Sequence, residues 1–171
     1  IYNKLVSSRE AVRNDLKQID IQLDRRFKVF ESLISAVNKY MDYEKTTLKD
    51  VVALRSQAQS AKSSGDQANR MSAENAISKI ASGINVMFEN YPDLKASQNV
   101  MQFQEEIVHT ENKLAFSKQA YNDGSERFNA MVQKFPVNLI VNFFGDAFDS
   151  FDYWQLSKDD AKTKEEYIAK L

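Results

Sequence analysis

The sequence contains no cysteine, and only two prolines and four glycines occur in its 171 residues. Without cysteine the chain can form neither a disulfide framework nor a thiolate zinc site. Turn-rich β architectures need glycine and proline at many corners, so the scarcity of both residues favours helices. No apolar run in the sequence reaches the roughly 18 residues that a membrane-spanning helix needs. We therefore expect one all-helical domain with one hydrophobic core.

The sequence also contains few residues that could catalyse a reaction. His109 is the only histidine, and no cysteine is available as a nucleophile, so a nucleophilic triad has no support. Glu106 and His109 form one Glu-x-x-His step, but a di-iron site in a helical bundle needs two. We interpret His109 as a solvated or boundary residue. The four glycines stand far apart and form no phosphate-binding loop. The sequence predicts no enzyme, no catalytic residue, no cofactor and no metal ligand.

Charge patterning gives no sign of nucleic-acid binding. The 23 lysines and arginines are balanced by 24 acidic residues, which leaves a formal net charge of -1. Basic residues near the start of the chain alternate with acids, so they form no continuous stripe that could follow a phosphate backbone. We expect no nucleic-acid partner.

Apolar residues recur every three or four positions along most of the chain, as on the buried face of an amphipathic helix. This spacing predicts four helices, at about 2–41, 47–62, 72–91 and 97–134. Polar residues at 42–46 are expected to break the first helix, Ser72 to cap the third and Pro92 to end it. Gly124 is the weak point of the fourth. We expect an up-and-down antiparallel four-helix bundle with long first and last helices and both termini at one end.

Beyond the four helices, Pro136 and Gly145 bracket a short apolar helix at 137–144. The bundle is predicted to span residues 1–145, and an acidic aromatic tail, partly ordered or flexible, to follow at 146–171. The short helix either plugs the end of the bundle or enters the interface of a bilayer. The tail aromatics either fold back on the bundle or dock a partner. The candidate membrane or partner contacts are Val137, Ile140, Val141, Phe143, Phe144, Phe148, Phe151, Tyr153 and Trp154.

Polar residues interrupt the apolar stripes of the first and the last predicted helix. They are Gln18, Asp20, Gln22, Arg25 and Arg26, and then Tyr121, Asn122 and Asp123. Buried polar groups need partners. We expect these groups to satisfy one another across the paired first and last helices rather than to hold a ligand.

Six strings of residues occur in an order that is specific to one family. They are YNKLV at 2–6, QIDIQLDRR at 18–26, YPDLKA at 91–96, TENKL at 110–114, AYND at 120–123 and FPVNLI at 135–140. Together they span most of residues 2–144 and resemble the LemA family of bacterial membrane-anchored proteins. The resemblance implies a four-helix bundle behind an N-terminal transmembrane helix, and it carries over no catalytic residue. After Gly145 the acidic tail departs from the pattern expected of the family.

From the resemblance and the missing chemistry we expect a non-enzymatic, membrane-tethered structural or interaction module that binds a protein partner. The alternative is a bundle that associates with lipid through the end that bears its termini. The anchor would precede Ile1, and the domain would lie on the extracytoplasmic side of a bacterial cell membrane.

Overall fold

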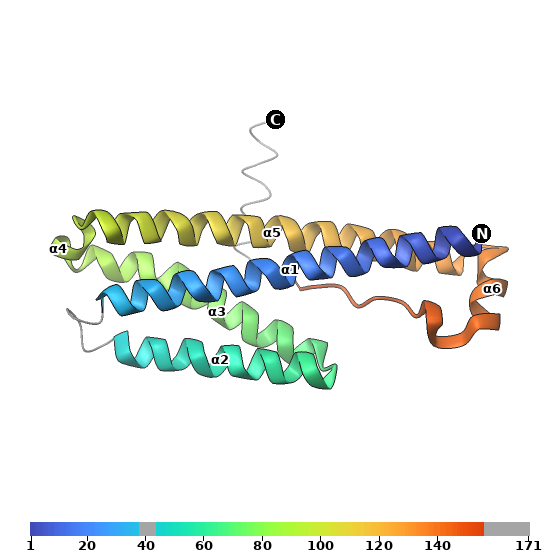
Figure 1. Ribbon diagram of the computed structural model, residues 1–171, viewed down its shortest axis with the longest axis horizontal. Helices are drawn as coiled ribbons and strands as arrows, with labels where there is room; N and C mark the ends of the chain where they lie inside the picture. Colours follow the sequence, from blue (N-terminus) through green and yellow to red (C-terminus); the bar gives the residue numbers. More distant parts are fainter. Residues whose placement is uncertain (38–43, 156–171) are drawn as a thin grey trace, which may run out of the picture. The chain divides into compact units, whose positions relative to one another are not determined.

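A computed structural model describes residues 1–37 and 44–155, and every regular element in these ranges is helical (Figure 1). The elements are α1 (Tyr2–Val37), α2 (Glu44–Ser64), α3 (Gln67–Glu89), α4 (Pro92–Lys95), α5 (Gln98–Gln133), α6 (Val137–Phe144) and the 3₁₀ helix η1 (Gly145–Phe148). The predicted all-α class is confirmed. Within these ranges, none of the helices combines the length with the hydropathy that a bilayer span requires.

Most helix ends lie close to their predicted positions. The α5 helix deviates by one residue at each end, and α6 coincides with the prediction and is followed by Gly145, whose φ is 58°. The start of α3 was predicted wrongly, because the helix begins at Gln67 and not at Ser72. The α2 helix already begins at Glu44, inside the predicted break at 42–46. Residues 42 and 43 of that break lie outside the described residues.

Asp66 explains the early start of α3. Its Oδ1 accepts a hydrogen bond from the backbone N–H of Asn69 at 3.1 Å, as an N-cap side chain does for the third residue of a helix. Gly65, with a φ of 75°, supplies the left-handed turn between α2 and α3 that other residues rarely adopt.

The cap leads to a first prediction. Asp66→Ala should lower the free energy of unfolding by about 1 kcal/mol, because it leaves an N–H at the start of α3 without its partner. Ser72→Ala is the matched control, since Ser72 lies exposed inside α3 and should be neutral there. Urea denaturation followed by circular dichroism measures both. A larger loss for Ser72→Ala would contradict the assignment of the cap.

The chain forms two compact units that share the two longest helices. Among the described residues, unit 1 comprises 1–22 and 114–155, and unit 2 comprises 23–37 and 44–113. Unit 2 has a core to which α1, α2, α3, α4 and α5 all contribute, with Phe30, Val51, Phe88, Leu94 and Ile107 among its buried side chains. Helices α2 and α3 pack against each other as a hairpin. The predicted boundary after residue 145 stays a prediction.

One set of buried positions on α1 and α5 recurs every seven residues. In unit 1 this set comprises Leu5, Val12 and Ile19 on α1, and Leu114, Tyr121 and Phe128 on α5, each at most 2% exposed. Such a repeat keeps one face of each helix toward its neighbour, as in a coiled coil. Gly124 continues the α5 helix, and a Cβ at this position would lie 3.1 Å from Asp15 Oδ2 on α1. The absent side chain therefore permits a close approach of the two helices.

Candidate functional site

Helix α6 exposes apolar side chains in unit 1. Six of its eight residues are apolar, yet none of the eight is buried. Phe143 is 84% exposed and Phe135, just before the helix, is 79% exposed. With Leu139 and Phe144, also exposed, they form what we call the α6 surface. Contiguous exposed apolar side chains commonly mark a site of interaction.

Aromatic contacts fix α6 to the first turn of α1. The ring of Phe144 lies 4.9 Å from that of Tyr2, and the ring of Phe148 in η1 lies 5.7 Å from Tyr2 in an edge-on arrangement. Arg9 of α1 stands over the Phe148 ring at 5.4 Å and donates a hydrogen bond of 2.9 Å to the carbonyl of Ala147. The α6 surface is therefore held in place rather than frayed.

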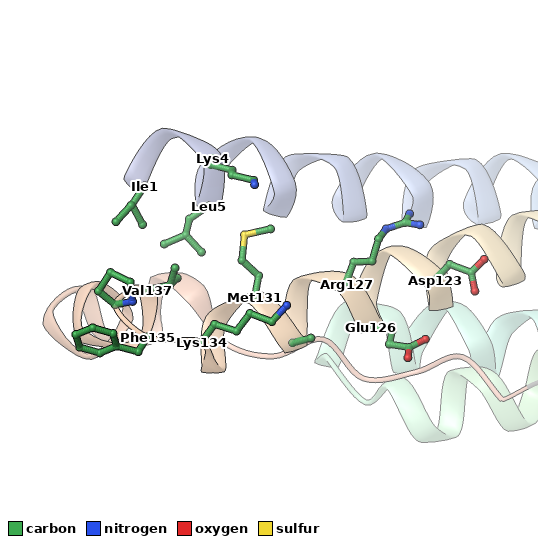
Figure 2. Close-up of a pocket in the computed structure, with 12 residues that line it drawn as sticks. Ile1, Lys4, Leu5, Asp123, Glu126, Arg127, Met131, Lys134, Phe135 and Val137 are labelled. Atoms are coloured by element: carbon green, nitrogen blue, oxygen red, sulfur yellow. The ribbon is translucent and has the colours of Figure 1, made fainter.

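A pocket of about 780 Å³ opens beside the α6 surface (Figure 2). Figure 2 shows Leu5 of α1 and Met131 of α5 projecting toward each other inside it. The remaining lining residues are Ile1, Lys4, Asp123, Glu126, Arg127, Ala130, Lys134, Phe135, Pro136 and Val137. Three cations and two carboxylates thus border an apolar floor. This arrangement can accept an apolar side chain and pair with charges of either sign around it.

The structure divides the nine predicted contact residues. Phe143, Phe144 and Tyr153 are exposed, whereas the other α6 members, Val137, Ile140 and Val141, are partly buried, as is Phe151. Phe148 and Trp154 are only 2% and 1% exposed, because the chain after α6 turns back and inserts both rings into unit 1. Of the two alternatives for the tail aromatics, folding back describes this pair, and neither ring offers a contact surface in this conformation. The prediction did not include Phe135 and Leu139, although both are apolar and lie just before or within the short helix; Tyr2 is brought to α6 only by the fold.

Of the polar residues in the apolar stripes, Arg26, Tyr121 and Asn122 bind partners that are mostly not the predicted ones. Arg26, 1% exposed, donates to Ser78 Oγ at 2.6 Å and to the Glu74 carbonyl at 3.1 Å, and it forms an ion pair with the Glu74 carboxylate on α3. Its contact with Glu111, at 3.3 Å, joins α1 to α5 as expected, but Glu111 is not one of the predicted partners. Tyr121 and Asn122 instead bind the backbone of residues 152 and 154.

A second arginine extends this group of charges in unit 2. Arg55 of α2 donates to Glu74 Oε1 at 2.8 Å and also pairs with Asp24. Ser78 donates to Glu111 Oε2 at 3.1 Å. Both oxygens of Glu74 and both terminal nitrogens of Arg26 are therefore engaged within the protein. The group is built to join α1, α2, α3 and α5, and we assign it no ligand.

His109 lies exposed on α5, which confirms its interpretation as a solvated residue. It borders a shallow depression of about 600 Å³ in unit 2, together with Glu89, Lys95 and Glu105. Among the described residues, no three or more histidines and carboxylates gather in a way that could hold a metal ion.

Comparisons with known proteins agree on one family. The family model described as LemA family matches residues 15–167. Protein LemA of Metamycoplasma hominis is 27% identical over 139 residues, which are 81% of this chain and 63% of that protein. The chain thus spans less than two thirds of the length of this relative. The family match extends through the acidic tail, so the expected departure from the family after Gly145 is wrong.

Proposed function

We propose, from the premise that this chain belongs to the LemA family, that it is a non-enzymatic interaction module held at a bacterial membrane. In this proposal the α6 surface binds a protein partner. The carrying observation is that α6 is anchored by aromatic contacts and still has no buried residue. Covering an exposed Phe or Leu side chain releases about 1.5–3 kcal/mol each, so a partner that buries the α6 surface gains affinity.

The surroundings of α6 favour a protein over a lipid surface. Protein interfaces combine aromatic anchors with a polar rim. The pocket beside α6 provides such a rim, with Lys4 and Lys134 as well as Asp123 and Glu126. Asp146 and Asp149 follow α6 and are exposed. Carboxylates at this position would be repelled by an anionic membrane.

Association with lipid is a second candidate. The observation in its favour is the 84% exposure of Phe143 on a helix whose apolar residues are flanked by Lys134. At about 12 Å, α6 is too short to span a bilayer and would lie in its interface.

The proposal includes an N-terminal transmembrane anchor, an extracytoplasmic position and an antiparallel up-and-down order of α1, α2, α3 and α5. The family resemblance supports the anchor, and the hairpin of α2 and α3 with the shared core of unit 2 supports the helix order. Fractionation of cells that produce the full-length protein tests the anchor, and protease added to spheroplasts tests the side. Protein in the soluble fraction, or protection from the protease, would count against these two points.

The test of the α6 surface uses crosslinking in living cells. A photoreactive amino acid replaces the exposed Leu139 in the full-length protein, with or without Phe143→Asp and Phe144→Asp. We expect a discrete protein adduct that falls at least about tenfold in the Asp variant, because two charged groups would have to be desolvated at the interface. Val86→Asp with Val108→Asp, two exposed positions in unit 2, should leave the adduct unchanged.

The same variants separate the two candidates. Flotation with liposomes of phosphatidylglycerol and phosphatidylethanolamine should not distinguish the α6 variant from its control if the partner is a protein. If only lipid adducts form and the α6 variant no longer floats with the liposomes, the α6 surface binds the membrane and not a protein partner. An adduct that is insensitive to the α6 substitutions would refute the assignment of the surface.

A further inference from the structure

Two asparagines of α5 hold the backbone of the segment that follows η1. Asn122 donates from Nδ2 to the Trp154 carbonyl at 2.8 Å and accepts the Trp154 N–H at 2.7 Å. Asn129 forms the same pair of hydrogen bonds with the carbonyl and N–H of Phe151, both at 2.9 Å. Each side-chain amide thus engages one residue of the segment as a neighbouring β-strand would. Residues 149–155 have no regular secondary structure of their own.

The spacing of the two asparagines matches an extended peptide. Seven residues of α-helix are nearly two full turns, so Asn122 and Asn129 lie on one face, about 10.5 Å apart along the axis. Three residues of extended chain span about 10–11 Å, which is the separation of Phe151 from Trp154 in sequence. The segment runs antiparallel to α5. Between the two asparagine contacts, the Tyr121 hydroxyl donates to the Asp152 carbonyl at 2.8 Å.

Side chains of the segment alternate between buried aromatics and exposed residues. Phe148 and Trp154 are buried, and Phe151 packs edge-on against the buried Phe128 at 5.2 Å. Asp149, Ser150, Asp152 and Tyr153 are exposed. The aromatic residues that enter unit 1 are therefore spaced by three, at positions 148, 151 and 154.

The contacts between α5 and the segment are of two kinds, hydrogen bonds to the main chain and packing of aromatic rings. The asparagine amides reach only main-chain atoms, which every peptide provides, whereas the aromatic rings select the sequence. Recognition of extended peptides commonly combines main-chain hydrogen bonds with pockets for particular side chains. We propose that Tyr121, Asn122, Phe128 and Asn129 form a binding site for an extended peptide with aromatic side chains at every third position. Residues 148–154 of the chain itself occupy this site in the structure. A partner protein binds by replacing them with a segment of its own that has the same aromatic spacing. The proposed site uses no residue of the α6 surface, although residues 148–154 include Phe148, which also contacts Tyr2 beside α6.

The test uses the full chain and exploits the fact that Trp154 is its only tryptophan. Trp154→Phe removes the tryptophan signal and weakens the chain's own ligand while an aromatic ring stays in place. A synthetic peptide with the sequence of residues 146–155 is then added, so that all tryptophan emission comes from the peptide. We expect a saturable blue shift of this emission, because the indole moves from water into a buried site.

Substitutions in the protein and in the peptide test which residues form the site. Asn122→Ala with Asn129→Ala should weaken peptide binding about tenfold or more, because four hydrogen bonds are lost. Asn14→Ala, at an exposed position of α1, should have no effect. A peptide with Tyr153→Ala should bind like the parent peptide, whereas a peptide with Phe151→Ala should bind more weakly. The unchanged chain should bind the parent peptide more weakly than Trp154→Phe does, because its own segment competes at high effective concentration.

Three results would overturn the proposal. One is tryptophan emission that stays at the wavelength of the free peptide, although circular dichroism shows that Trp154→Phe keeps the helix content of the unchanged chain. The second is binding that the asparagine substitutions do not alter. If Trp154→Phe fails to fold, the unchanged chain is titrated with the peptide carrying phenylalanine at position 154. Displacement of the chain's own segment then exposes Trp154 and increases its quenching by acrylamide. Quenching that stays constant at saturating peptide is the third refuting result.

Discussion

Replacing Arg26 with methionine is expected to lower the free energy of unfolding by about 3–5 kcal/mol. Methionine fills much of the same volume but removes the positive charge that faces Glu74 and Glu111. Glu74 is only 1% exposed and would retain Arg55 as its charged partner on one oxygen alone. The loss follows from the uncompensated buried carboxylate, and not from the intrinsic strength of the ion pair.

Arg25→Met is the matched control for this prediction. Arg25 is the preceding residue of α1 and is exposed, so the same chemical change should alter stability by no more than about 0.5 kcal/mol. Urea denaturation followed by circular dichroism gives both values. Similar losses for the two variants, or a loss below about 1 kcal/mol for Arg26→Met, would show that the charge group contributes little to holding the helices of unit 2 together.

The position of Arg26 shows what periodicity predicts and what it leaves open. Arg26 continues the seven-residue repeat of Leu5, Val12 and Ile19, and Leu33 follows it seven residues later, so its place on the buried face of α1 is visible in the sequence. The repeat specifies the face but not the neighbour. We expected partners on the last helix, whereas most of the hydrogen bonds go to Ser78 and Glu74 on α3.

Helix α6 was predicted with correct ends because Pro136 and Gly145 restrict the backbone locally. Its exposure could not be read from the sequence. A helix that is apolar on nearly every side is expected to be buried, and only the surrounding chain determines whether anything covers it. The same reasoning applies to the tail, where aromatic residues among acids fit either a docked or a free segment. The seven-residue separation of Asn122 and Asn129 places both amides on one face of α5, which is the one feature of the sequence that favours a docked segment.

Phe128→Ala should lower the free energy of unfolding of unit 1 by about 3–5 kcal/mol, since it removes a fully buried ring. Phe128 belongs to the seven-residue repeat of α5 and also contacts the Phe151 ring. Its removal therefore opens a cavity on the buried face of α5 and weakens the packing of the docked segment. Phe143→Ala is the control, because the Phe143 ring is 84% exposed and should contribute little to stability.

Hydrogen exchange along α5 shows where the stability is lost. The helix passes through both units, with residues 98–113 in unit 2 and residues 114–133 in unit 1. If the two units open separately, Phe128→Ala accelerates amide exchange mainly in residues 114–133, because local opening depends on the contacts of each unit. Equal acceleration in both parts of α5 would contradict separate opening and show that the continuous helices make the two units unfold together.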